Sequence, residues 1–142
     1  MGDENTIFNL YHRVHKELIE AISLMAGPYE FNRGDLPVLA RLVKGGDGVT
    51  QKEILEDLPI SKSTMSKIIN NMSQKGYLRK EKDPEDRRAT LIYLTEKGKK
   101  TEKAIREIDT RVEKIMLKGF SKEEKERLSG YLERLLENLE SI

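Results

Sequence analysis

Residues 50–76 read TQKEILEDLPISKSTMSKIINNMSQKG, and this stretch predicts two short helices joined by a tight turn. Thr50 and Glu53 form a capping box, in which each side chain accepts a hydrogen bond from a backbone amide at the start of a helix. Pro59 cannot continue that first helix, and Ser61 is a good N-cap for the next one. Two helices connected in this way are typical of a helix-turn-helix.

The second helix of this pair has one apolar stripe and one polar face. The stripe has the i, i+3, i+4, i+7 spacing of a buried helix face and consists of Met65, Ile68, Ile69 and Met72. No acidic residue occurs between Ser61 and Lys80. A helix that enters the major groove of DNA avoids carboxylates near the phosphates, while hydroxyls, amides and lysines reach base edges. A merely solvated face is the alternative. The residues predicted to contact DNA are Lys62, Ser63, Thr64, Ser66, Lys67 and Asn70.

A basic β-hairpin is predicted directly after this helix. Residues 77–82 and 89–94 favour extended structure, and residues 83–86, with the sequence DPED, supply the turn between them. Arg87 and Arg88 lie near the tip of this hairpin. Arginine at such a tip can enter the minor groove of DNA, so we predict that both residues contact DNA. The alternative is that they are only solubilising charges at a turn.

Four further helices flank these elements. Apolar residues recur at helical spacing over residues 5–26, 36–44, 95–118 and 121–142, and residues 32–35 offer N-caps for the second of them, which we start near Asp35. A domain of this size has few other apolar residues that could cover the leucine stripe of the last helix. We therefore expect this helix and the first one to form a dimer interface, since a helix-turn-helix generally needs two copies to read two half-sites about 34 Å apart.

Composition narrows the class of protein. The chain has 142 residues and a formal net charge of +1, with the positive charge concentrated in residues 61–94, which hold eight Lys/Arg and four Asp/Glu. Such a local excess is typical of a nucleic-acid surface. No cysteine is present, so disulfides, thiolate zinc sites and cysteine nucleophiles are excluded, and two histidines leave little for a metal. We expect no cofactor, no signal peptide and no membrane helix, and hence a cytoplasmic protein.

The order of predicted elements resembles the multiple antibiotic resistance regulator (MarR) family of winged helix-turn-helix proteins. The most specific part is residues 83–98, DPEDRRATLIYLTEKG, which is similar to the family's wing signature of Asp-x-Arg followed by Leu-Thr-x-x-Gly. The resemblance implies that Arg88 is the minor-groove arginine and that Asp86 shapes the wing through a salt bridge. The alternative is that Asp86 is a simple turn residue. Residues 34–37 depart from the family's usual start of the second helix.

The resemblance also implies an architecture and a mode of action. The fold class is mainly α with a small β-hairpin wing, in a single MarR-like chain over residues 1–142. Within it, residues 33–98 are expected to form the winged DNA-binding lobe, and residues 5–26 and 99–142 the dimerisation helices. The family implies a homodimer that binds a pseudo-palindromic operator as a repressor and that a small phenolic or aromatic acid releases from DNA.

The effector and the function class are less constrained by the residues themselves. The candidate effector-binding residues are Tyr11, His12, His15 and Tyr29. The alternative for the two histidines is that they are simply exposed near a dimer interface. The alternative for the two tyrosines is that they pack in a core or an interface. A winged-helix module that binds protein instead of DNA is the alternative function. An enzyme is not expected, because no nucleophile, base and oxyanion set occurs at a recognisable spacing, and no glycine-rich phosphate loop is present.

Overall fold

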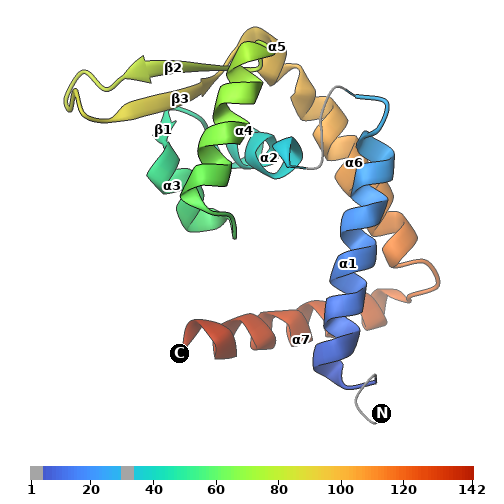
Figure 1. Ribbon diagram of the computed structural model, residues 1–142. Coiled ribbons are helices and arrows are strands. Elements are labelled where there is room, and N and C mark those ends of the chain that lie inside the picture. The colour runs from blue at the N-terminus through green and yellow to red at the C-terminus, as the bar shows by residue number, and fades with distance from the viewer. Residues whose placement is uncertain (1–4, 30–33) are drawn as a thin grey trace. The chain divides into compact units, whose positions relative to one another are not determined.

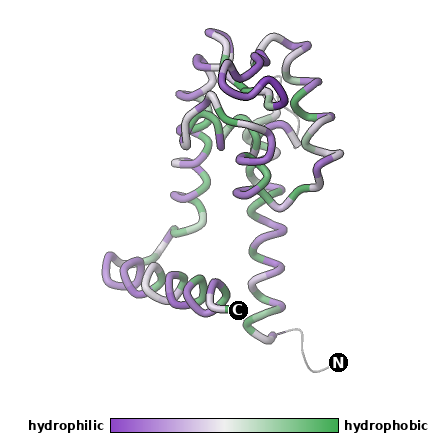
Figure 2. The backbone as a smooth tube through the Cα atoms, turned by 90° about the vertical axis from the view of Figure 1, so that its left-hand side faces the viewer, coloured by the Kyte–Doolittle hydropathy of each residue, from purple (hydrophilic) through white to green (hydrophobic). Residues whose placement is uncertain are grey.

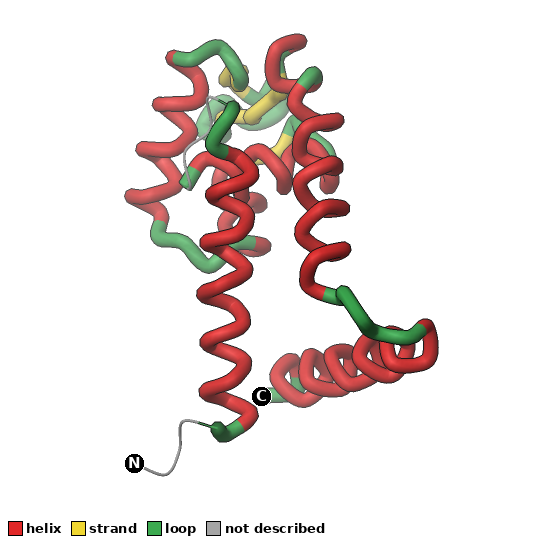
Figure 3. The backbone as a smooth tube through the Cα atoms, turned by 90° about the vertical axis from the view of Figure 1, so that its right-hand side faces the viewer, coloured by secondary structure: helices red, strands yellow, loops and turns green. Residues whose placement is uncertain are grey.

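The computed structural model describes residues 5–29 and 34–142. The chain divides into two compact units, Met1–Asp109 and Thr110–Ile142. The elements of the first unit are α1 (Ile7–Ala26), α2 (Asp35–Gly45), β1 (Val49–Thr50), α3 (Gln51–Asp57), α4 (Lys62–Gln74), β2 (Leu78–Lys82), β3 (Thr90–Leu94) and α5 (Glu96–Lys99). Helix α6 (Thr101–Met116) runs across the boundary, and α7 (Lys122–Glu140) lies in the second unit. Figures 1 and 3 show that helices dominate, so the predicted fold class is confirmed.

The predicted hairpin is part of a three-stranded antiparallel sheet in the order β1-β3-β2. Leu78 pairs with Leu94 and Lys82 with Thr90, which sets the register of the wing. On the other side of β3, Val49 pairs with Ile92. The sequence analysis missed β1, because a strand of two residues shows no alternation that a pattern could reveal.

The core of the first unit lies where α2, α3 and α4 meet the sheet. The stripe predicted on α4 is buried, with Met65, Ile69 and Met72 at 0% exposure and Ile68 at 9%. The side chains packed around it that are also fully enclosed are Val38, Leu39, Leu42, Ile54 and Ile92. Because one face of α4 is held in this core, its polar face is turned outward.

Local capping explains where several helices begin. Thr50 and Glu53 form the predicted capping box of α3, and the Ser61 hydroxyl accepts a hydrogen bond from the Thr64 amide at the start of α4. The predicted cap of α2 is different: its N-cap is Gly34, which has no side chain to bond, while Asn32 lies outside the described residues. The lack of a side-chain cap lowers the stability of α2 only slightly, because Asp35 in the first turn still places a negative charge at the positive end of the helix dipole.

The helix predicted over residues 95–118 is two helices. Thr95 caps α5 through the Gly98 amide, and Lys100 separates α5 from α6. The Thr101 hydroxyl, which is buried, donates to the Gly98 carbonyl at 2.6 Å and fixes the junction. Both segments share the same amphipathic period, so the break gives no signal in the hydrophobic pattern.

The second unit contains α7, which begins with the predicted capping box of Ser121 and Glu124. Backbone and side-chain hydrogen bonds from Ser121 hold the pKa of the Glu124 carboxyl below its ordinary value, so its ionised form closes the cap at neutral pH. Figure 2 shows hydrophobic and hydrophilic stretches alternating along this helix. Its leucine stripe is exposed, from 44% at Leu132 to 66% at Leu139.

Candidate nucleic-acid interface

The first turn of α4 presents a cluster of hydroxyls. The Ser61 hydroxyl donates to Thr64 Oγ1 at 2.9 Å and lies 3.2 Å from Ser63 Oγ. All three side chains are exposed, as are Lys62, Lys67 and Asn70 farther along the helix. Five of the six contact residues predicted on α4 are therefore exposed on an outward face that carries no carboxylate, and the sixth, Ser66, is half-buried.

Ser66 is tied to the other helix of the helix-turn-helix. Its hydroxyl accepts a hydrogen bond from Gln51 Nε2 at 3.2 Å, which joins α3 to α4. Gln51 was not among the predicted site residues, since its place in the first turn of α3 says nothing about which helix it faces. The bond fixes the rotation of α4 relative to α3, and so directs which side chains of α4 point outward.

The tip of the wing is held by hydrogen bonds of its own turn. The Asp83 amide donates to the Ala89 carbonyl and the Ala89 amide to the Asp86 carbonyl, both at 3.0 Å. Asp86 Oδ1 also accepts from the Arg88 backbone amide at 3.0 Å. Among the described residues no ion pair joins Asp86 to the Arg88 guanidinium, and the carboxylate forms an Asx turn, which is the alternative role of Asp86. The side chains of Arg87 and Arg88 are exposed and available.

Asp86→Asn and Asp86→Ala separate these two accounts, because both remove the charge and only the asparagine keeps an acceptor for the Arg88 amide. We expect Asp86→Asn to bind duplex DNA at least as tightly as the wild type, and Asp86→Ala to bind a few-fold more weakly than Asp86→Asn, since one backbone hydrogen bond contributes about 1 kcal/mol. Electrophoretic mobility shift with one duplex measures the difference. Equal affinities of the two variants would contradict the turn role.

The strands of the wing add positive charge beside α4. Lys80 on β2 donates a hydrogen bond to Asn70 Oδ1 on α4, which connects the wing to the polar face of the helix. Arg79 is paired with Glu81 and lies over the Tyr93 ring, 4.5 Å from its centroid. Lys80 was not among the predicted contact residues, because a contact between residues ten positions apart depends on how the sheet packs against the helix.

Three of the four predicted effector residues lie on α1, and the fourth follows that helix. Tyr11, His12 and His15 are exposed on α1, where the Tyr11 and His15 rings stack with centroids 6.4 Å apart. Tyr29 is also exposed, at 39%. None of these residues is among those that line the pocket described next.

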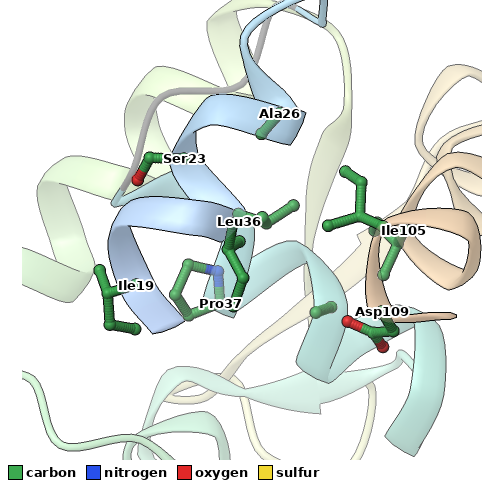
Figure 4. Close-up of a pocket in the computed structure, with 10 residues that line it drawn as sticks. Ile19, Ser23, Ala26, Leu36, Pro37, Ile105 and Asp109 are labelled. Atoms are coloured by element: carbon green, nitrogen blue, oxygen red, sulfur yellow. The ribbon is translucent and has the colours of Figure 1, made fainter. Parts of the chain in front are cut away.

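A mostly apolar pocket of about 160 Å³ lies between α1, α2 and the first half of α6 (Figure 4). Only Ser23 and Asp109 bring hydroxyl or carboxylate groups to it. Asp109 is paired with Lys44 of α2. The remaining lining residues are Ile19, Ile22, Ala26, Leu36, Pro37, Ala40, Ile105 and Ile108.

Other kinds of site find no support in the described part of the chain. Within residues 5–29 and 34–142 no three His, Asp or Glu side chains lie close enough together to hold a metal ion. None of the helices described there has both the length and the apolar character that crossing a membrane requires.

A helix-turn-helix followed by a basic hairpin, with an outward polar helix face, defines a winged-helix protein. The sequence model of the family described as MarR family matches residues 29–89. Over these residues the chain is similar to a family of transcriptional regulators and not of enzymes. The family match thus covers α2 through the turn of the wing, which is where the candidate interface lies.

Individual transcriptional regulators are also similar to this chain. The HTH-type transcriptional regulator YybA of Bacillus subtilis is 28% identical over 111 residues, which are 78% of this chain and 73% of YybA. The crystal structure of a MarR transcriptional regulator from Methanosarcina mazei Go1 is 28% identical, covers 96% of this chain and 98% of its own, and superposes with a TM-score of 0.87. A MarR family protein from Listeria monocytogenes complexed with 26mer DNA shares the fold, with a TM-score of 0.85 at 22% identity, over 95% of this chain and 89% of its own.

Proposed function

We propose that the protein is a cytoplasmic transcriptional repressor that binds a pseudo-palindromic operator as a homodimer. Helix α4 enters the major groove with its polar face, and Arg88 at the wing tip enters the adjacent minor groove. The observation that carries this proposal is the carboxylate-free outward face of α4, joined through Lys80 and Asn70 to a basic wing. The Listeria protein of the same fold was crystallised in complex with 26mer DNA, which supports the assignment of DNA as the partner.

The proposal assigns separate roles to parts of the chain. Residues 33–98 form the DNA-binding lobe, and residues 5–26 and 99–142 form the dimerisation helices. Support comes from exposed apolar side chains on both α1 and α7, such as Phe8 at 71% and Leu136 at 56%. A second copy that covers these faces would remove them from water and present two lobes to one duplex.

Selection of genomic fragments by the purified protein tests this function. We expect an enriched site with two-fold symmetry and half-sites about one helical turn apart, and an affinity that falls steeply as salt rises because bound phosphates release counterions. The alternative, a winged module that binds protein, predicts no common site and a weak salt dependence. Enrichment of a site without symmetry would contradict the dimer while leaving DNA binding in place.

We further propose that a small phenolic or aromatic molecule releases the DNA by occupying the pocket between α1, α2 and α6. No residue on the lining is a cation, and its carboxylate, Asp109, is paired with Lys44, so an anion in the pocket would be desolvated without a counter-charge. Of the two effector chemistries that the resemblance implies, a neutral phenol therefore suits the pocket better than an aromatic acid. The differential affinity needed is modest, since tenfold release corresponds to about 1.4 kcal/mol.

Titration of neutral phenols and benzoate into the protein–DNA complex tests the effector. We expect release by the phenol and not by benzoate, loss of the phenol effect in Ala40→Leu, which fills the pocket, and a gain of benzoate response in Asp109→Asn. Thermal unfolding checks that both variants remain folded. A phenol that binds the wild type while leaving its affinity for DNA unchanged would argue against the effector role.

A further inference from the structure

The contact between Lys80 and Asn70 joins two residues that are both exposed to solvent. Lys80 pairs across the sheet with Ile92, and side chains of directly opposite residues lie on the same face of a sheet. Ile92 is fully buried, so Lys80 leaves β2 on the face that packs against α4. Its ammonium group therefore reaches the helix as a consequence of the register of the wing.

The chemistry of the pair fixes how the Asn70 amide is turned. A lysine ammonium group only donates hydrogen bonds, so it must face the amide oxygen of Asn70 and not the amide nitrogen. The NH₂ group of Asn70, which donates two hydrogen bonds, is left for other partners. Asn70 follows Ser63 by seven residues and Lys67 by three, so it shares their outward face of α4.

An asparagine reads adenine with both ends of its amide, since the oxygen accepts from N6 and the nitrogen donates to N7. With Lys80 at the oxygen, adenine would bring its N6 amino group, which is also a donor, beside the ammonium. Guanine offers two acceptors, N7 and O6, and thymine offers O4. These edges suit the NH₂ group of Asn70, whereas the second lone pair of its amide oxygen lies beside an ammonium group that disfavours a further amino donor.

We propose that Lys80 is a positioning residue that turns the Asn70 amide so that it reads its base through its NH₂ group, and that the operator base opposite Asn70 is therefore guanine or thymine, with adenine disfavoured. This inference rests on the proposed function, because it assumes that α4 lies in the major groove. It assigns to a wing residue a role in base choice by the recognition helix, in addition to any contact with phosphate.

Selection from a library of randomised duplexes tests the proposal with the wild-type protein, Lys80→Met and Lys82→Met. Methionine keeps the aliphatic stem and removes the charge. Lys82 lies two residues farther along the same face of β2 and serves as the matched control for loss of one charge. We expect Lys80→Met to raise the acceptance of adenine about tenfold at one position of each half-site, and Lys82→Met to keep the wild-type motif with a lower overall affinity.

Asn70→Ala identifies the position independently. It should lose base preference at the position that Lys80→Met alters and at no other. The proposal is overturned if Lys80→Met weakens binding to all duplexes equally and leaves the motif unchanged, or if the two variants alter different positions. A wild-type protein that enriches no motif would instead overturn the proposed function itself, and the inference with it.

Discussion

Gly98→Ala is expected to lower the free energy of unfolding by about 2–3 kcal/mol, the cost of overfilling a packed site. A Cβ at this position would overlap the Tyr77 carbonyl oxygen and would lie 3.1 Å from Leu94 Cδ2. The carbonyl cannot move away freely, because it accepts a hydrogen bond from the Thr95 amide at 3.1 Å. The overlap involves backbone and not the end of a flexible side chain, so the structure has no easy way to relax.

Thermal unfolding followed by circular dichroism measures this effect, and we expect the midpoint to fall by roughly 5 to 10 °C. Gly130→Ala in α7 is the matched control. A Cβ there meets nothing within 4 Å, so alanine should stabilise its helix by about 0.5–1 kcal/mol. A Gly98→Ala melting point equal to that of the wild type would mean that the approach of α5 to Tyr77 is looser than described.

Lys67→Glu is expected to reduce affinity for the selected operator by about a hundredfold, because it replaces a cation on the outward face of α4 with a carboxylate near the phosphates. Such a loss corresponds to about 2.7 kcal/mol. The slope of log affinity against log salt should also become shallower by at least one unit, the change expected for loss of one phosphate contact.

Lys122→Glu, at the first residue of α7, makes the same change of charge outside the candidate interface and serves as the control. It should leave affinity within about twofold of the wild type. Fluorescence anisotropy with a labelled operator at several salt concentrations gives both quantities. If Lys67→Glu and Arg88→Ala both bound as the wild type does, the DNA-binding role of α4 and the wing would have to be abandoned.

Helices α3 and α4 of the winged lobe were predictable because short sequence patterns specify where each of them begins and which face is buried. The capping box at Thr50, the Ser61 cap and the stripe from Met65 to Met72 depend on residues within two turns of one another, and all three are confirmed. The glycine of the wing signature shows what a sequence motif does not reveal, namely the packing reason for a residue. The motif includes Gly98, but only the packed structure shows that its missing side chain makes room for the Tyr77 carbonyl.

Features that depend on tertiary packing could not be predicted. The bond between Lys80 and Asn70 depends on the register in which β2 pairs with β3. The pocket is lined by residues of three helices that are far apart in the chain. The bond of Asp86 to the Arg88 amide could not be predicted for a related reason, since the sequence shows that a carboxylate precedes an arginine but not whether it bonds to the guanidinium or to the amide.

The short strand β1 has a consequence for the operators that the protein could tolerate. It immediately precedes α3 and is bonded to β3, with the Gly48 amide donating to the Ile92 carbonyl at 2.7 Å, so the hairpin is anchored at the base of the helix-turn-helix. The two DNA-reading elements of one subunit should therefore keep a constant separation. A base pair inserted within a half-site would put them out of phase with the grooves, and natural variation in spacer length should be confined to the centre of the palindrome.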